Sequence, residues 1–264
     1  MINISKLDLT KNPFWYIKKK EIIDGQLFQN LKKDFPDDDL YNNINNLRKI
    51  SARAGDDLYP CDENYEKLLN RSESWKIFIE FLNSKKFLDN VFDIFHDNLV
   101  YENLKVNLSN YVLEKTYTPS RFERANSQKN LMIKKIMNTF YNKKNNLYVT
   151  CDISRAKTGY SLKPHCDHQY RLFSFIIYFT NPKTIGLNGG NLEIYKRKNP
   201  KLKSRNLNKT ELELVESIAP EENLGILFPS HNYSYHSVSP IKEIQGYRKF
   251  LYIGISSRSN FIWN

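Results

Sequence analysis

The second half of the chain consists of short apolar stretches separated by turn residues, and this pattern constrains the fold more than any other feature. From Leu147 onward, alternating or continuous apolar residues recur in short runs, for example at 175–180, 191–195 and 225–228. Runs of this length predict β-strands, and many of them in succession predict two packed antiparallel sheets. We therefore expect a jelly-roll barrel over residues 146–258.

The first part of the chain, residues 1–145, has a mainly helical pattern. Apolar residues recur at helical spacing in 24–36, 74–82 and 87–95, with Pro36 and the polar residues 83–86 as breaks. We expect an α+β protein of one domain, 1–264, with these N-terminal helices packed against the barrel. Residues 119–145 are basic around a short apolar core and predict a helix or a flap.

A basic run at 196–205 interrupts the barrel pattern, and we interpret 196–223 as an insertion. A long connection in a compact domain is either a functional lid or a solvated excursion, and the sequence leaves both open.

Three polar residues in this half have the chemistry of metal ligands. His165 and Asp167 are two positions apart, so in a strand their side chains share one face, while Cys166 points to the other. His236 supplies a third ligand. Two imidazoles and one carboxylate form the facial triad of non-haem Fe(II) oxygenases, which leaves coordination positions open for a co-substrate and O2.

A bidentate keto acid such as 2-oxoglutarate would fill two of the open positions, and its far carboxylate needs a fixed cation. Arg248, twelve positions after His236, suits this role, because a guanidinium matches a carboxylate with two parallel hydrogen bonds.

Several motifs in order resemble the prolyl-4-hydroxylase-like branch of the Fe(II)/2-oxoglutarate-dependent dioxygenase superfamily. They are 159–167, Arg171 with 175–181, 189–195, 227–230 leading to 236–241, and Gly246 before Arg248. The similarity covers roughly residues 145–258. It implies a double-stranded β-helix, a cupin-like jelly roll, and an enzyme that uses Fe(II), 2-oxoglutarate and O2, with ascorbate as a further cofactor candidate.

Carried over residue by residue, the resemblance implies that His165, Asp167 and His236 bind iron and form the catalytic centre. Arg248 and Tyr178 would bind the distal carboxylate of 2-oxoglutarate. Many relatives have a tyrosine where this chain has Ala156, so another side chain takes that role or the pocket is wider. Halogenating relatives lack the carboxylate that Asp167 provides, so hydroxylation is favoured over chlorination.

We therefore expect a hydroxylase that acts on an unactivated C–H bond of a small-molecule, sugar-derived or peptidyl substrate. Oxidative demethylation of nucleic acid is an alternative, motivated by the net charge of +11, and a non-catalytic metal-binding barrel is another. The basic residues are scattered and not interleaved with aromatic residues, which favours a solvated surface over a nucleic-acid site. The positive charge is compatible with an anionic substrate.

The remaining features of the sequence concern cellular location, the cysteines and the residues near the motifs. No apolar stretch is long enough to span a membrane and the N-terminus has no signal-peptide pattern, so we expect a cytoplasmic protein with no membrane partner. Three cysteines without a CxxC unit suggest neither a disulfide framework nor a zinc site. We interpret His168 and His231 as supporting or surface residues. Arg171 either faces the active site or braces a strand end, and the sequence leaves both roles open. Gly189 and Gly190 are expected in a turn with positive φ.

Overall fold

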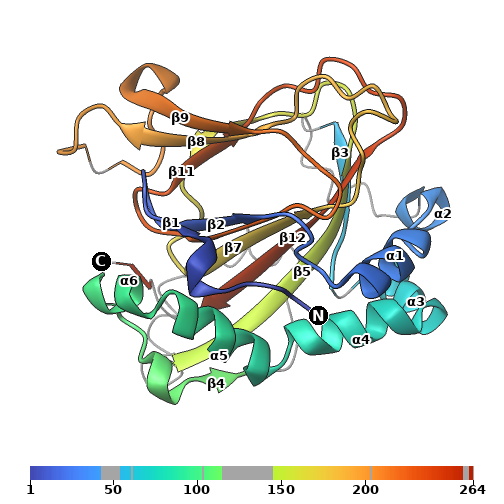
Figure 1. Ribbon diagram of the computed structural model, residues 1–264, viewed down its shortest axis with the longest axis horizontal. Helices are drawn as coiled ribbons and strands as arrows, with labels where there is room; N and C mark the ends of the chain where they lie inside the picture. Colours follow the sequence, from blue (N-terminus) through green and yellow to red (C-terminus); the bar gives the residue numbers. More distant parts are fainter. Residues whose placement is uncertain are drawn as a thin grey trace.

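The computed structural model describes residues 1–42, 54–60, 62–102, 104–114, 145–202, 204–257 and 262–263. Two β-sheets face each other, and helices pack against the outer side of the larger sheet (Figure 1). Among these residues, none of the helices combines the length and the apolar character that crossing a membrane requires.

The barrel is formed by the strands from β5 to β12. Their bounds are β5 Asn146–Ala156, β6 Leu162–His165, β7 Arg171–Tyr178, β8 Leu192–Arg197, β9 Leu212–Ile218, β10 Gly225–Pro229, β11 Tyr235–Val238 and β12 Arg248–Ser257. The large sheet has the order β10-β7-β12-β5 at its centre, and the small sheet has the order β6-β11-β8-β9. The chain thus changes sheet at every step except the hairpin from β8 to β9. This alternation is the double-stranded β-helix that the sequence predicts.

N-terminal strands widen the large sheet on both sides. β1 (Leu9–Thr10) and β2 (Tyr16–Lys19) extend it beyond β10, while β3 (Gly55–Leu58) and β4 (Val112–Leu113) both pair with β5. The described strands of the two sheets do not pair with each other, but side chains bridge one edge. Tyr16 and Lys18 of β2 both donate hydrogen bonds to the Glu216 carboxylate of β9.

Six helices are defined: α1 Gly25–Lys33, α2 Asp38–Asn42, α3 Glu63–Arg71, α4 Glu73–Leu82, α5 Lys85–Ile94 and α6 His96–Tyr101. The Ser72 and Ser84 hydroxyls cap α4 and α5 by accepting from backbone N–H groups, and α1 ends before Pro36. Trp75 and Phe95 are fully buried in the core between the helices and the sheet, where the Phe95 ring lies 5.0 Å from that of Phe173 in β7. The predicted helices are therefore present, and they cover the sheet as expected.

The two faces of the large sheet have different surroundings because side chains alternate along each strand. In β5, Val149, Cys151 and Ile153 face the helices and belong to the main apolar core. Ala156, together with Phe250 of β12, belongs to a second cluster inside the barrel. Residues of even number in β5 and β12 therefore face the small sheet across the barrel.

The structure differs from the sequence prediction in two places. The N-terminal part contributes the strands β1 to β4 as well as helices. Within 196–223, interpreted as an insertion, β9 pairs along its length with β8 and is a barrel strand. The basic residues that precede it masked its pattern, in which only Leu212 and Ile218, at the ends, are buried. Of the expected helix or flap at 119–145, only Asn145 lies within the described residues.

Candidate metal centre

Strands β6 and β11 are neighbours in the small sheet and bring the two imidazoles together. His236 pairs with His165 in the antiparallel register, and their ring centroids are 4.5 Å apart. Asp167 follows two residues after β6 ends. Each of the three residues offers one ligand atom, and these atoms all lie within 4.8 Å of one another. The structure thus gathers His165, Asp167 and His236 around one point.

Backbone hydrogen bonds orient both imidazoles. The Nδ1 atoms of His165 and His236 lie 2.8 Å from the Lys163 carbonyl oxygen and 3.0 Å from the Ser234 carbonyl oxygen, respectively. Carbonyl oxygens only accept, so each Nδ1 carries the proton and each Nε2 keeps its lone pair. The two Nε2 atoms lie 3.9 Å and 3.8 Å from the Asp167 carboxylate. Burial lowers the pKa of His236 to about 4, which keeps this imidazole neutral and able to bind a metal.

Hydroxyl groups hold the Asp167 carboxylate in place. Ser174 of β7 donates to Oδ2 at 2.5 Å, and Tyr252 of β12 donates to Oδ1 at 3.1 Å. The Ser230 hydroxyl lies 3.0 Å from that of Ser174 and extends the network. Burial favours the protonated acid, but His236, His165 and further neighbours outweigh it and lower the pKa of Asp167, so the group is a carboxylate. The donor set fits a divalent iron ion.

Arg248 lies inside the barrel at the start of β12. Its side chain is 1% exposed, its Nη1 donates to the Gly190 carbonyl oxygen, and its Nε has no hydrogen-bond partner within the described residues. The guanidinium carbon is 5.1 Å, 5.7 Å and 4.6 Å from the ring centroids of Tyr160, Tyr178 and Phe250. A buried cation in an aromatic pocket is suited to receive a carboxylate.

The turn before β8 allows this arrangement. Gly189 and Gly190 have φ values of +88° and +71°, as the sequence predicts. A Cβ on Gly190 would lie 3.3 Å from Arg248 Nη1 and 2.9 Å from the Ile241 side chain, so a larger residue would disturb the arginine.

Ala156, where the sequence departs from many relatives, is buried and pairs with Arg248 in the sheet. Its small side chain leaves room beside the guanidinium. The Tyr160 ring, four residues later, occupies the neighbourhood of Arg248. Tyr178 is 1% exposed, and burial raises the pKa of its hydroxyl although Arg248 opposes this shift. Tyr178 is thus a neutral hydrogen-bond donor beside the arginine.

The other polar residues near the triad have different surroundings. Cys166 belongs to a separate apolar cluster with Tyr195 and Tyr235, away from the ligand atoms, as the sequence predicts. His168 stacks on Tyr170 at 4.0 Å. His231 is fully buried, and its ring stacks on Tyr233 at 4.6 Å. Neither of these histidines belongs to the metal-ligating group found in the described part of the chain.

Sequence reasoning missed the residues that hold Asp167, namely Ser174, Ser230 and Tyr252. The sequence marks Ser174 and Tyr252 only by their positions, because they alternate with apolar residues that face the helices. That signal becomes readable only when the register of β7 against β12 is known, with Gly254 opposite Ser174.

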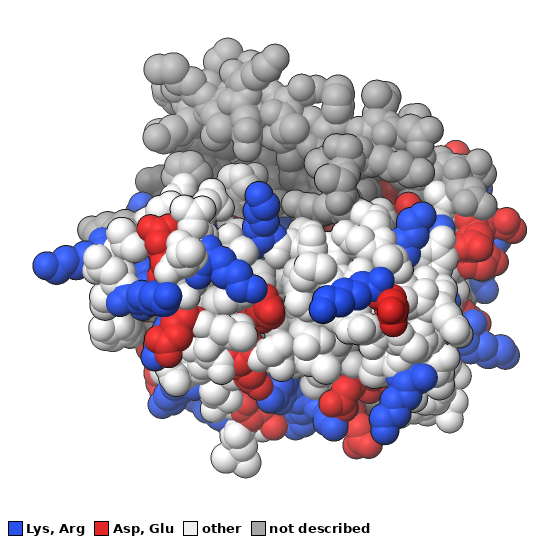
Figure 2. Space-filling view, turned by 90° about the horizontal axis from the view of Figure 1, so that it is seen from above, with Lys and Arg blue, Asp and Glu red and all other residues white. Residues whose placement is uncertain are grey.

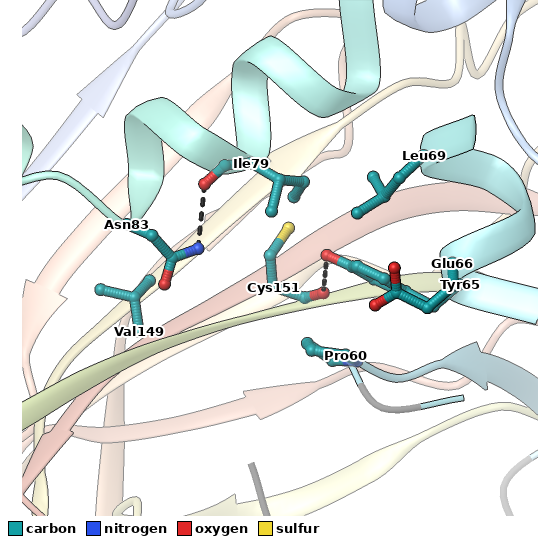
Figure 3. Close-up of a pocket in the computed structure, with 8 residues that line it drawn as sticks. All are labelled: Pro60, Tyr65, Glu66, Leu69, Ile79, Asn83, Val149 and Cys151. Atoms are coloured by element: carbon teal, nitrogen blue, oxygen red, sulfur yellow. Dashed lines mark hydrogen bonds between the residues drawn. The ribbon is translucent and has the colours of Figure 1, made fainter. Parts of the chain in front are cut away.

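A second hollow lies on the opposite face of β5 and is separate from the metal centre. Figure 3 shows it between α3, α4 and β5. Tyr65 donates to the Cys151 carbonyl oxygen there at 3.2 Å, and Asn83 donates to the Ile79 carbonyl oxygen at 2.9 Å. Cys151 and Val149 face this hollow, whereas Thr150 and Asp152 face the barrel.

Charges of both signs are mixed on the one face of the molecule that Figure 2 shows. On the face shown in Figure 2, Lys and Arg side chains alternate with Asp and Glu side chains, and no continuous patch of one sign crosses the described residues. Ion pairs among the described residues, such as Lys196–Glu213 and Lys18–Glu216, also bring opposite charges together. A nucleic-acid groove requires a concentrated patch of positive charge, and this face has none among the described residues.

Comparison with known proteins gives a family match. Residues 151–254 match the family described as the 2OG-Fe(II) oxygenase superfamily. No curated protein matches the chain.

Several solved structures are similar to this chain. A prolyl-4-hydroxylase from Pseudomonas putida has a TM-score of 0.48 and 14% identity, over 92% of this chain and 93% of that chain. A prolyl 4-hydroxylase from Phytophthora capsici has a TM-score of 0.49 and 14% identity, over 92% of this chain and 58% of that one. The viral collagen prolyl hydroxylase of Paramecium Bursaria Chlorella virus-1 has a TM-score of 0.40 and 13% identity, over 92% and 96% of the two chains.

Proposed function

We propose that this protein, whose residues 151–254 match the 2OG-Fe(II) oxygenase superfamily, hydroxylates an unactivated C–H bond of a small-molecule, sugar-derived or peptidyl substrate. In this proposal it is a 2-oxoglutarate-dependent dioxygenase that uses Fe(II), 2-oxoglutarate and O2.

One observation carries the proposal: a metal-ligating triad lies in the same barrel as a buried arginine that pairs with no carboxylate of the described residues. His165, Asp167 and His236 would hold Fe(II) through two Nε2 atoms and one carboxylate oxygen. Bound iron would supply the activation of O2 and the oxidation of the C–H bond, with 2-oxoglutarate providing two electrons as it is converted to succinate and CO2.

Arg248 would bind the distal carboxylate of 2-oxoglutarate. What supports this role is that its Nε lacks a hydrogen-bond partner in the described part of the chain while the side chain is 1% exposed. Aromatic rings on three sides exclude water and strengthen a charge-assisted hydrogen bond. Tyr178 would donate a further hydrogen bond to the same carboxylate.

Asp167 favours hydroxylation over chlorination, because its carboxylate fills the coordination position that a halide would need. Ser174 and Tyr252 hold both of its oxygens. This carboxylate would therefore stay fixed during turnover, and the chain's own contribution is a rigid ligand set in a water-poor pocket.

The experiment is an anaerobic titration with Fe(II) and 2-oxoglutarate, followed by aerobic measurement of succinate release. We expect Asp167→Ala to abolish succinate release while the circular dichroism spectrum stays that of the wild type. Asp97→Ala, on the exposed surface of α6, is the matched control and should behave as the wild type. Full succinate release by Asp167→Ala would remove Asp167 from the ligand set.

A further inference from the structure

We infer that Arg171 and Asp152 form the binding site for the substrate's carboxylate and ammonium groups, and that the substrate is a free amino acid. This inference rests on the proposed function and names the substrate class of the same centre.

Arg171 is a buried arginine with unused hydrogen-bonding capacity. Arg171 is the first residue of β7 and is 9% exposed. Its side chain lies directly over Gly254 of β12, where an added Cβ would be 0.9 Å from Nη1 of Arg171. Only glycine at position 254 permits this placement. In the described residues the guanidinium makes a single side-chain hydrogen bond, 3.5 Å from Nη1 to the Thr150 hydroxyl. A guanidinium has five N–H donors, so most of them remain for a ligand.

Arg171 lies beside the metal centre. Its guanidinium carbon is 5.2 Å from the centroid of the Tyr252 ring, and the hydroxyl of the same tyrosine donates to Asp167 at 3.1 Å. One side chain therefore contacts both the proposed iron ligand and the arginine. A group bound to Arg171 would belong to a molecule that reaches the metal within a few bonds.

The two buried arginines lie on opposite sides of the metal centre. Arg248 lies over Phe250 and Arg171 lies over Gly254, four positions further along β12. At about 3.3 Å per residue, this separates the two guanidinium groups by about 13 Å, with Tyr252 between them. The barrel can therefore hold 2-oxoglutarate on the side of Arg248 and a second carboxylate on the side of Arg171.

The surroundings of Arg171 are polar, in contrast to the aromatic pocket of Arg248. Asp152 of β5 is 5% exposed and lies opposite Tyr252 in the sheet. Thr150 and Asp152 are two residues apart and face the barrel together. Burial alone would lower the pKa of Arg171, but Tyr252, Asp167, Tyr148 and Asp152 raise it, so the guanidinium stays charged. An adjacent cation and anion are complementary to a zwitterion, whose carboxylate a guanidinium binds with two hydrogen bonds.

The test compares matched compounds on the wild-type holoenzyme, loaded with Fe(II) and 2-oxoglutarate. Each standard L-amino acid is assayed for stimulation of succinate release beside its carboxamide, which lacks the carboxylate, and its N-acetyl derivative, which lacks the ammonium group. We expect at least one free amino acid to stimulate, and both derivatives to do so with KM values about 10- to 100-fold higher. Stimulation by no free amino acid, or equal stimulation by either derivative, overturns the inference.

Variants link the recognition to the two residues. Arg171→Gln and Asp152→Asn should each raise the KM for the stimulating amino acid about 10-fold or more, while the KM for 2-oxoglutarate changes by less than about twofold. Arg248→Lys should show the reverse pattern. Arg171→Lys, which keeps the charge, serves where Arg171→Gln does not fold, and Arg71→Gln on the exposed end of α3 is the matched control. Variants of Arg171 and Asp152 with wild-type KM for the amino acid contradict the assignment.

Failure of this inference can be told apart from failure of the proposed function. Anaerobic binding of 2-oxoglutarate and its slow turnover without substrate test the iron centre alone. If both are present and the amino acids have no effect, only the substrate assignment fails.

Discussion

The buried guanidinium of Arg248 leads to a prediction in which stability and binding change in opposite directions. Arg248→Met keeps the length of the side chain and removes the charge. Without 2-oxoglutarate the wild-type cation is 1% exposed, and no carboxylate among the described residues forms an ion pair with it. Burying a charge costs several kcal/mol, of which one charge-assisted hydrogen bond and the ring contacts offset a large part.

We therefore expect the methionine variant, without ligands, to be more stable by about 1–2 kcal/mol. For a protein of this size, that corresponds to a rise in Tm of about 3–6 °C. In the presence of 2-oxoglutarate the order should reverse. Removing one partner of a buried charge pair costs about 2–5 kcal/mol of binding free energy, which raises Kd about 30- to 5,000-fold. At a concentration of 100 times Kd, the wild type gains about 2.7 kcal/mol from its ligand.

The assay is thermal unfolding under anaerobic conditions, with and without 2-oxoglutarate at constant Fe(II). Arg248→Lys is the control, because it keeps a buried cation and should not gain stability without ligand. If Arg248→Met is less stable than the wild type without ligand and is still stabilised by 2-oxoglutarate, Arg248 is not the residue that binds the carboxylate of 2-oxoglutarate.

Three further predictions concern the supporting residues. Tyr252→Phe removes the hydrogen bond to Asp167 and should weaken Fe(II) binding about 10-fold in an anaerobic titration, and an unchanged affinity would contradict the supporting role. Burial lowers the pKa of His231 to about 3, below its ordinary value of 6.5, so the unfolded chain binds more protons between these values. The free energy of unfolding should then fall on acidification below pH 6.5, by up to about 1.4 kcal/mol per pH unit from this group, and urea unfolding of His231→Phe should show a shallower slope. Glu216→Gln weakens the bridge to Tyr16 and Lys18 and should cost about 1 kcal/mol in urea unfolding, whereas exposed Glu63→Gln should cost less.

Much of the barrel could be predicted from the sequence because its strands alternate or are wholly apolar. β7 is buried along its whole length, and Ser174 alone interrupts its apolar run after Arg171. β9 was missed because only its two terminal residues are buried and a basic run precedes it. β1 to β4 are at most four residues long, which is too short for a periodic pattern.

The candidate metal ligands could be predicted in part from spacing. His165 and Asp167 are two residues apart, although the structure ends β6 at His165 and places Asp167 beyond it. The proximity of His236 depends on the pairing of β11 with β6, which no local pattern contains. Motif resemblance supplied this residue. The hydroxyl network around Asp167 could not be predicted, because Ser174 and Tyr252 come from strands far apart in the sequence.

A single strand organises the interior of this barrel. The barrel-facing positions of β12 carry Arg248 at the proposed 2-oxoglutarate end, Tyr252 at the metal centre and Gly254 beneath Arg171. Because strand side chains alternate faces, these residues are spaced by even numbers and share one line. An insertion of one residue between Arg248 and Tyr252 would turn one of them toward the helices. The positions of co-substrate, iron and substrate in the proposed reaction thus depend on the alternation of side chains along β12, whose pairing with β5 and β7 fixes its register.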